Sequence, residues 1–172
     1  MTHLDRQWIE DHIPHRGSMC LLDAVLDWDT SGARCTSTSH RALHNPLRAY
    51  DRLGATCGIE YAAQAMAVHG ALVALATGVA APRGYLASVR GVELQVDRLD
   101  DVEEILLASV ERLAGDEHTV LYQFALTGVD GSALQVAGSG AASAGRVLVT
   151  GRAAIAFDTG NFGLLHRSNG HS

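Results

Sequence analysis

The sequence predicts an α+β fold in which one antiparallel sheet wraps around a single long helix. The first observation is an uncharged run at residues 61–81, in which nine of the 21 residues are alanine. The second is that strand-like segments stand on both sides of this run, two before it and four after it. The third is that the later segments alternate roughly in polarity and are separated by Gly or Asp turns such as GDE, VDG and AGR.

The six strand segments share this alternation and are bounded by turn residues. In chain order they are 18–29, 33–40, 85–96, 104–114, 118–129 and 145–157. Residues 104–114 also fit a helical pattern, but their place in a run of hairpins favours a strand, so the last four segments predict a meander. The small side chains on every face of the helix suggest close packing against a sheet curved around it. This arrangement is the hotdog architecture.

Two further segments are expected to lie outside the sheet. Residues 129–145 are rich in small side chains and predict a long loop or a ragged strand edge. Residues 158–172 are polar and contain glycine, so we expect a flexible C-terminal tail. The domain prediction is therefore one hotdog domain over residues 1–157, followed by the tail.

The uncharged run also has the length of a transmembrane helix. Its many alanines add little transfer free energy, it contains Gln64 and His69, and no basic cluster flanks it. A helix that is apolar all round can equally be the buried centre of a soluble domain. We favour the buried helix and expect no membrane span.

Composition narrows the class of protein. The formal net charge is −6, and no basic run or aromatic platform is present, so nucleic acid is not expected as a partner. All thirteen basic side chains are arginine, so any contact with a phosphate would use a guanidinium group. Cys20, Cys35 and Cys57 stand far apart without CxxC spacing, which indicates free thiols and no metal site. The charged N-terminus lacks the apolar core of a signal peptide, and we expect a cytoplasmic protein.

Glu60 is the only Asp, Glu, Lys or Arg residue between Arg52 and Arg83, and it stands at the start of the apolar helix. Gln64 follows four residues later, which places both side chains on one helical face. A partly buried carboxyl group is expected to have a raised pKa, so that Glu60 could act as a neutral acid held by a hydrogen bond from Gln64. The alternative is an exposed glutamate stabilised by the helix dipole.

Two motifs resemble the hotdog-fold 3-hydroxyacyl-acyl-carrier-protein dehydratases. IPHRGSMCLLDAVLDWD at 13–29 resembles the opening segment of that family, and GIEYAAQAM at 58–66 resembles its helix motif. NPLR before the helix is similar to a divergent branch linked with aryl-polyene-type biosynthetic clusters. The resemblance implies dehydration of a 3-hydroxyacyl thioester on acyl carrier protein to the trans-2-enoyl thioester, without a cofactor. It assigns Glu60 as the acid.

The family's base is a histidine in an HFPG segment, fourteen residues before the acid. Here His44 opens an HNP sequence sixteen residues before Glu60, and the following glycine is missing. His15 lies in an intact IPHR motif, where the neighbouring Pro14 restricts the backbone. Imidazole is the side chain that most readily takes up a proton near neutral pH. We expect His15 to be the base and keep His44 as the second candidate.

Substrate contacts are expected around the start of the helix. The first-turn amides near residues 54–58, including Cys57 and Gly58, are candidates to stabilise an enolate oxygen. Cys57 itself is interpreted as a packing residue, because dehydration needs no nucleophile. Arg48 belongs to a basic segment, 41–52, that could contact the phosphate of a phosphopantetheine arm or an acidic carrier protein. A solvated loop is an equally good interpretation of that segment.

Two other functions fit the same residues. A hotdog acyl-thioesterase would use the same carboxylate to activate water. A non-catalytic hotdog subunit would support a dehydratase partner, and the altered histidine segment favours this alternative. In each case we expect a homodimer or a heteromer with another hotdog subunit, since a single wrapped sheet leaves an edge strand uncovered.

Overall fold

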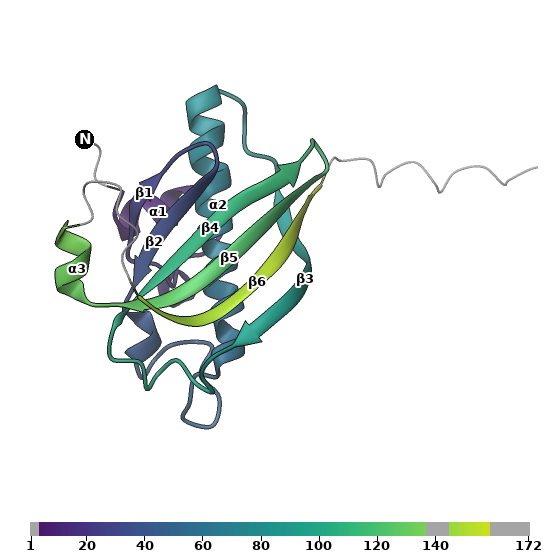
Figure 1. Ribbon diagram of the computed structural model, residues 1–172. Coiled ribbons are helices and arrows are strands. Elements are labelled where there is room, and N and C mark those ends of the chain that lie inside the picture. The colour runs from purple at the N-terminus through teal and green to yellow at the C-terminus, as the bar shows by residue number, and fades with distance from the viewer. Residues whose placement is uncertain (1–3, 137–144, 159–172) are drawn as a thin grey trace, which may run out of the picture.

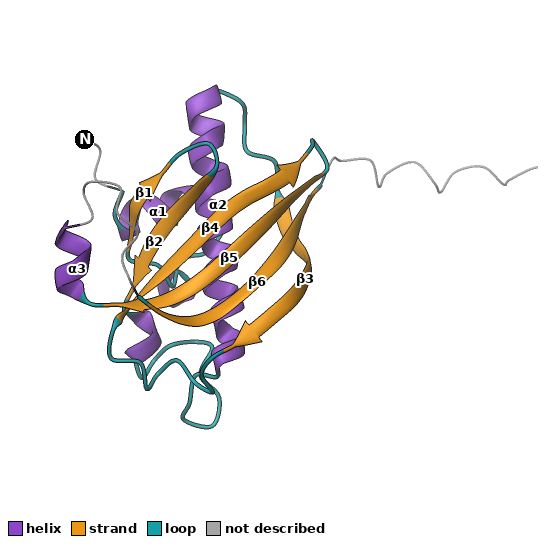
Figure 2. Ribbon diagram, viewed as in Figure 1, coloured by secondary structure: helices purple, strands orange, loops and turns teal. Residues whose placement is uncertain are grey.

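The computed structural model describes residues 4–136 and 145–158, and it has the predicted hotdog architecture. One six-stranded antiparallel sheet curves around the long helix α2, Gly58–Thr77 (Figure 1). The strands form one layer and α2 lies on its concave face, as the colouring by element makes clear (Figure 2). The sequence prediction of an α+β fold with a central helix is confirmed.

Helix α2 forms the core of the domain because small side chains let it lie close to the sheet. Its buried residues are Gly58, Tyr61, Ala62, Gln64, Ala65, Met66, Val68, His69, Ala71 and Leu72. Gly78 ends the helix with φ 69°, a left-handed conformation that glycine adopts without strain. Within the described ranges this is the one helix long and apolar enough to cross a membrane, counted from Ala55 to Thr77. The burial of α2 against the sheet explains its apolar composition.

The strands lie close to their predicted positions. They are β1 Ala24–Trp28, β2 Gly32–Ser37, β3 Gly84–Leu94, β4 Ile105–Gly115, β5 Thr119–Val129 and β6 Arg146–Phe157. The sheet order is β1-β2-β4-β5-β6-β3, so β4, β5 and β6 form a meander. The prediction that β3 begins the meander was wrong, because β3 pairs with β6 and forms the far edge of the sheet.

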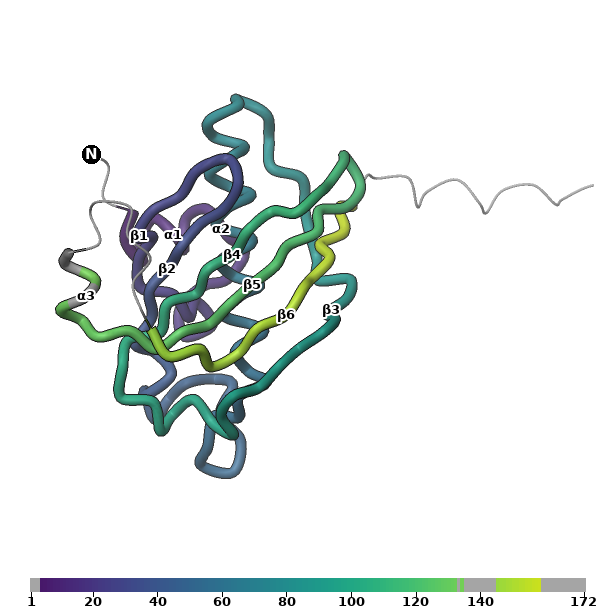
Figure 3. The backbone as a smooth tube through the Cα atoms, in the orientation of Figure 1, coloured from purple at the N-terminus to yellow at the C-terminus, as the bar shows by residue number. Residues whose placement is uncertain are grey.

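The loop from β3 to β4 explains this strand order. Its residues bind the segment that precedes α2: Leu99 N–H donates to the Leu53 carbonyl at 2.8 Å, and Ala55 N–H donates to that of Asp97 at 3.0 Å. Leu99 is fully buried there. The loop therefore carries the chain across the end of the sheet, past the start of α2, and β4 pairs with β2 instead of β3 (Figure 3).

Two helices were not predicted. Helix α1, Arg6–His12, begins at Asp5, whose side chain accepts a hydrogen bond from Trp8 N–H, and it buries Ile9. Helix α3, Gly131–Val136, occupies the start of the segment expected to be a loop or a ragged edge. The rest of that segment before residue 145, and the predicted tail apart from Asp158, lie outside the described residues.

Candidate active site

Glu60 lies in the first turn of α2, and the packing of that turn fixes its position. The turn follows a 3-10 turn at Ala55–Cys57. A Cβ at Gly58 would lie 3.0 Å from Leu126 Cδ2 and 3.1 Å from Val149 Cγ2, so the backbone here lies directly on the sheet. Glu60 points away from this contact, and its side chain retains 33% of its exposure.

Gln64 connects Glu60 to the segment that follows the IPHR motif. Its side chain is fully buried. Nε2 donates to the Met19 carbonyl at 2.8 Å and to Glu60 Oε1 at 3.1 Å, while Oε1 accepts from Leu21 N–H at 2.9 Å. The predicted hydrogen bond to Glu60 is therefore present. The other two bonds orient the amide so that its nitrogen faces the carboxylate.

His15 lies against the same carboxylate oxygen. Its Nε2 is 3.1 Å from Glu60 Oε1, although the two residues are 45 positions apart. His15 Nδ1 is buried, and none of the described residues offers it a hydrogen-bond partner. Nε2 is therefore the ring nitrogen that faces Glu60, and it can donate a hydrogen bond to the carboxylate. No hydrogen bond within the described residues reaches Glu60 Oε2.

The hydrogen bond from His15 lowers the pKa of Glu60 below its ordinary value. Burial acts in the opposite direction and raises this pKa, but the bond from His15 outweighs it, and the Gln64 amide lowers it further. The prediction of a raised pKa and a neutral acid was therefore wrong for the free protein. Glu60 is a carboxylate at neutral pH.

His44, the second candidate base, lies in an exposed turn. Among the described residues, no hydrogen bond or ion pair joins its ring to Glu60. Its neighbour Asn45 is buried and bonds to the Tyr61 hydroxyl at 3.0 Å. The HNP sequence thus contributes a structural asparagine, with the histidine turned to solvent.

The basic segment 41–52 does not present a row of free arginines. Arg48 donates to the Asp51 carbonyl at 2.8 Å, and it lies 3.5 Å from Asp100 Oδ2 with its side chain largely buried. Arg41 and Arg52 donate to carbonyl oxygens of the β3–β4 loop. These guanidinium groups hold that loop against the segment before α2.

The backbone amides expected to bind an enolate oxygen are already engaged. Ala55 N–H donates to the Asp97 carbonyl, and Cys57 N–H donates to the Gly54 carbonyl at 3.0 Å. Gly58 N–H donates to the Ala55 carbonyl within the 3-10 turn. The expectation of unpaired donors was wrong for these three amides, because the 3-10 turn satisfies Cys57 and Gly58 and the β3–β4 loop satisfies Ala55.

The thiols pack in the interior, and none forms a disulfide. Burial raises the pKa of the Cys57 thiol, whose Sγ lies 3.8 Å from the Leu47 carbonyl, and raises the pKa of Cys35 to about 12. Protonated thiols are poor nucleophiles and poor metal ligands. Within residues 4–136 and 145–158, no group of three or more His, Cys, Asp or Glu side chains could hold a metal ion.

A buried network of hydrogen bonds, which the sequence analysis did not predict, supports the segment that binds Gln64. Ser37 and Ser39 hydroxyls donate to the Leu21 carbonyl at 2.6 and 2.8 Å. The Ser39 hydroxyl also lies 2.9 Å from the Tyr61 hydroxyl. The Leu21 peptide is thus held on both sides, by Gln64 and by these serines. The only indication of this network in the sequence was Tyr61, which directly follows Glu60 in the helix motif.

Comparison with known proteins agrees with this arrangement. Residues 7–144 match the ApeP-like family, described as ApeP dehydratase. The fold is similar to "The Dehydratase Heterocomplex ApeI:P from Xenorhabdus doucetiae", with a TM-score of 0.69, 23% identity, and 87% of this chain and 90% of that chain covered.

A "Thioesterase family protein from Silicibacter pomeroyi" is similar in fold, with a TM-score of 0.50, 10% identity, and 77% and 81% of the two chains covered. No curated protein matches the sequence. Both structural likenesses are below 25% identity and concern the fold, whereas the family match spans most of the sequence. The chain therefore belongs to the ApeP-like dehydratase family.

Proposed function

We propose that the protein dehydrates a 3-hydroxyacyl thioester carried on acyl carrier protein, in a fatty acid, polyene or polyketide-like pathway in the cytoplasm. The observation that carries the proposal is the contact of 3.1 Å between His15 Nε2 and Glu60 Oε1, with Oε2 left without a partner among the described residues. The family match supports a dehydratase.

Dehydration breaks the C2–H bond and the C3–O bond, forms the C2–C3 double bond and releases water. Glu60 starts as a carboxylate, so its Oε2 can take the proton from C2. The resulting carboxylic acid can give that proton to the departing hydroxyl group. His15 and Gln64 both bind Oε1, which orients Oε2 toward the substrate and stabilises the ionised form. In this mechanism Glu60 is the base and His15 orients it, whereas the sequence analysis predicted that His15 itself would be the base.

A second hotdog subunit is part of the proposal. Among the described residues, the 11-residue strand β3 pairs only with β6, so none of them covers its outer edge. Tyr85, Leu86 and Leu94 on this strand are exposed. An exposed strand edge of this length is normally covered. The similar structure is described as a dehydratase heterocomplex, ApeI:P, which favours a heteromer over a homodimer.

The test is to incubate the protein with a 3-hydroxyacyl carrier thioester and to follow both enoyl formation and release of free thiol. We expect enoyl product, and we expect Glu60→Gln to keep the fold but to lower turnover by about a hundredfold or more. Glu117→Gln is the matched control, because Glu117 is 85% exposed and distant from the helix motif in sequence.

Free thiol without enoyl product would indicate a thioesterase instead. Activity that requires an added hotdog subunit, and that survives Glu60→Gln, would indicate a non-catalytic supporting role. Near-normal dehydration by folded Glu60→Gln protein alone would contradict the proposed mechanism.

A further inference from the structure

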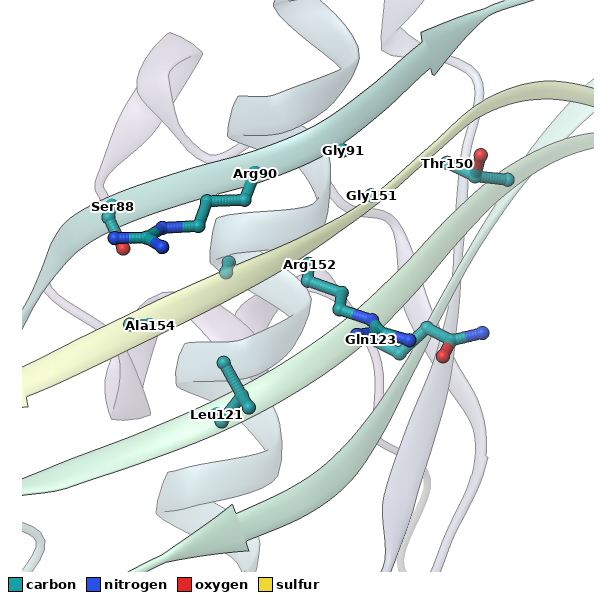
Figure 4. Close-up of a pocket in the computed structure, with 10 residues that line it drawn as sticks. Ser88, Arg90, Gly91, Leu121, Gln123, Thr150, Gly151, Arg152 and Ala154 are labelled. Carbon is teal, nitrogen blue, oxygen red and sulfur yellow. The ribbon is translucent and has the colours of Figure 1, made fainter.

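A hollow lies on the outer face of the sheet, away from Glu60. It has a volume of about 680 Å³ and is formed by β3, β5 and β6. Arg90, Arg152, Gln123, Ser88 and Thr150 are among its lining residues (Figure 4). Figure 4 shows α2 behind the strands, so these side chains stand on the face opposite to the helix.

Two exposed arginines line this hollow. Arg90 on the edge strand is directly opposite Arg152 on β6, and both are exposed. Neither guanidinium group has a hydrogen bond or ion pair within the part of the chain that the structure describes. By contrast, Arg34, which also lies on the sheet, forms an ion pair with Asp27. Like charges directly opposite each other destabilise a sheet, so this pair has a cost that a bound anion would remove.

The surrounding groups are hydrogen-bond donors. Gln123 is opposite Arg152 on its other side, and the hydroxyls of Ser88 and Thr150 flank the two arginines. In Figure 4 the Arg90 guanidinium is directed toward Ser88 and that of Arg152 lies near Gln123, so the two groups point apart.

The edge strand is irregular at this place. Its register shifts between Arg90 and Glu93, and Gly91 in between has φ 57°. Such bulges change the direction of neighbouring side chains and are frequent beside binding sites. An alanine at Gly91 would have room but would be strained by this φ.

The nearby acidic side chains leave the arginines unpaired. Glu93 is opposite Thr150, and Glu111 is opposite Gln123, two strands away from Arg152. No ion pair joins either carboxylate to Arg90 or Arg152 among the described residues. The two positive charges are therefore available to a ligand.

We propose that this hollow binds a phosphate dianion, either free or as a phosphate monoester. Guanidinium groups match phosphate oxygens with paired hydrogen bonds, and two of them balance the charge of a dianion. The hydroxyl and amide donors at the rim can satisfy the remaining oxygens. The site is on the opposite face of the sheet from α2 and does not depend on the proposed dehydration.

The experiment measures thermal unfolding of the full chain at pH 8 in sodium phosphate, with sodium chloride at matched ionic strength as the reference. A second arm uses phenyl phosphate in place of inorganic phosphate. For a site with a Kd near ~1 mM, we expect ~20 mM phosphate to raise Tm by about 4 °C. A shift with both compounds assigns a monoester site, and a shift with inorganic phosphate alone assigns a site for the free ion.

The double variant Arg90→Gln/Arg152→Gln should lose this shift, and without phosphate its Tm should equal or exceed that of the wild type, because the like-charge pair is gone. Arg83→Gln is the control for the loss of an exposed positive charge, and it changes the net charge by half as much as the double variant does. An equal phosphate shift in the double variant would overturn the proposal, as would no shift in the wild type. Loss of subunit association in the double variant, without any phosphate effect, would assign the arginines to an interface and also overturn it.

Discussion

Replacing Gln64 by methionine tests whether this side chain organises the site. Gln64→Met keeps a long flexible side chain but removes all three hydrogen bonds. Leu21 is fully buried, so its N–H loses its partner without access to water, at about 1–3 kcal/mol. Met19 is 40% exposed, so its carbonyl can bind water instead and adds little. Together with the lost bond to the Glu60 carboxylate, we expect the free energy of unfolding to fall by about 3 kcal/mol.

Thermal unfolding followed by circular dichroism measures this loss. For a chain of this size, about 3 kcal/mol corresponds to a decrease in Tm of about 6–12 °C. Gln7→Met is the matched control, because Gln7 is exposed and donates one hydrogen bond to Asp11, so its Tm should stay within about 2 °C of the wild type. If Gln64→Met unfolds at the same temperature as Gln7→Met, the reasoning about the Leu21 N–H is refuted.

Two further predictions concern the start of α2. Because the pKa of folded Glu60 is lowered, its interactions stabilise the fold fully above the ordinary value of 4.5 and are lost as the pH falls through the folded value. Between about pH 5 and 3, His15→Ala should therefore lose stability less steeply than the wild type in urea titrations, and parallel curves would contradict the assigned cause. Gly58→Ala should lower the free energy of unfolding by about 1–3 kcal/mol, because its methyl group meets Leu126. If Gly58→Ala has the same urea midpoint as the wild type, the sheet moves to accommodate the methyl group and the predicted loss of stability is wrong.

Most of the fold could be predicted because the strand pattern is local. β4, β5 and β6 begin and end within a few residues of the segments identified by alternation and turns. The place of β3 could not be predicted in this way. It depends on hydrogen bonds between the β3–β4 loop and the segment before α2, which join residues more than 40 positions apart. Helix α1 was missed because seven residues give too short a pattern.

The sequence predicted which residues form the candidate site better than it predicted the direction of the pKa shift at Glu60. The motifs brought attention to His15, Glu60 and Gln64, which the structure brings together. The sign of the pKa shift at Glu60 depended on whether burial or the His15 hydrogen bond is stronger, and spacing carries no information about that balance. Arg48 was predicted to contact the substrate because it belongs to a basic segment. Its partner in the structure, Asp100, lies in a loop that comes near Arg48 only in the folded chain.

The claim that His15 and Glu60 act as a pair is tested most directly by comparing His15→Ala with His44→Ala. Single-turnover enoyl formation from a 3-hydroxyacyl carrier thioester, at saturating substrate, separates the chemical step from binding. We expect His15→Ala to slow this step by about a hundredfold or more, because Glu60 loses the group that orients it and favours its ionised form. His44→Ala should proceed at nearly the wild-type rate and require more substrate. A slow His44→Ala with a normal His15→Ala would contradict the pair and assign the chemistry to the HNP segment.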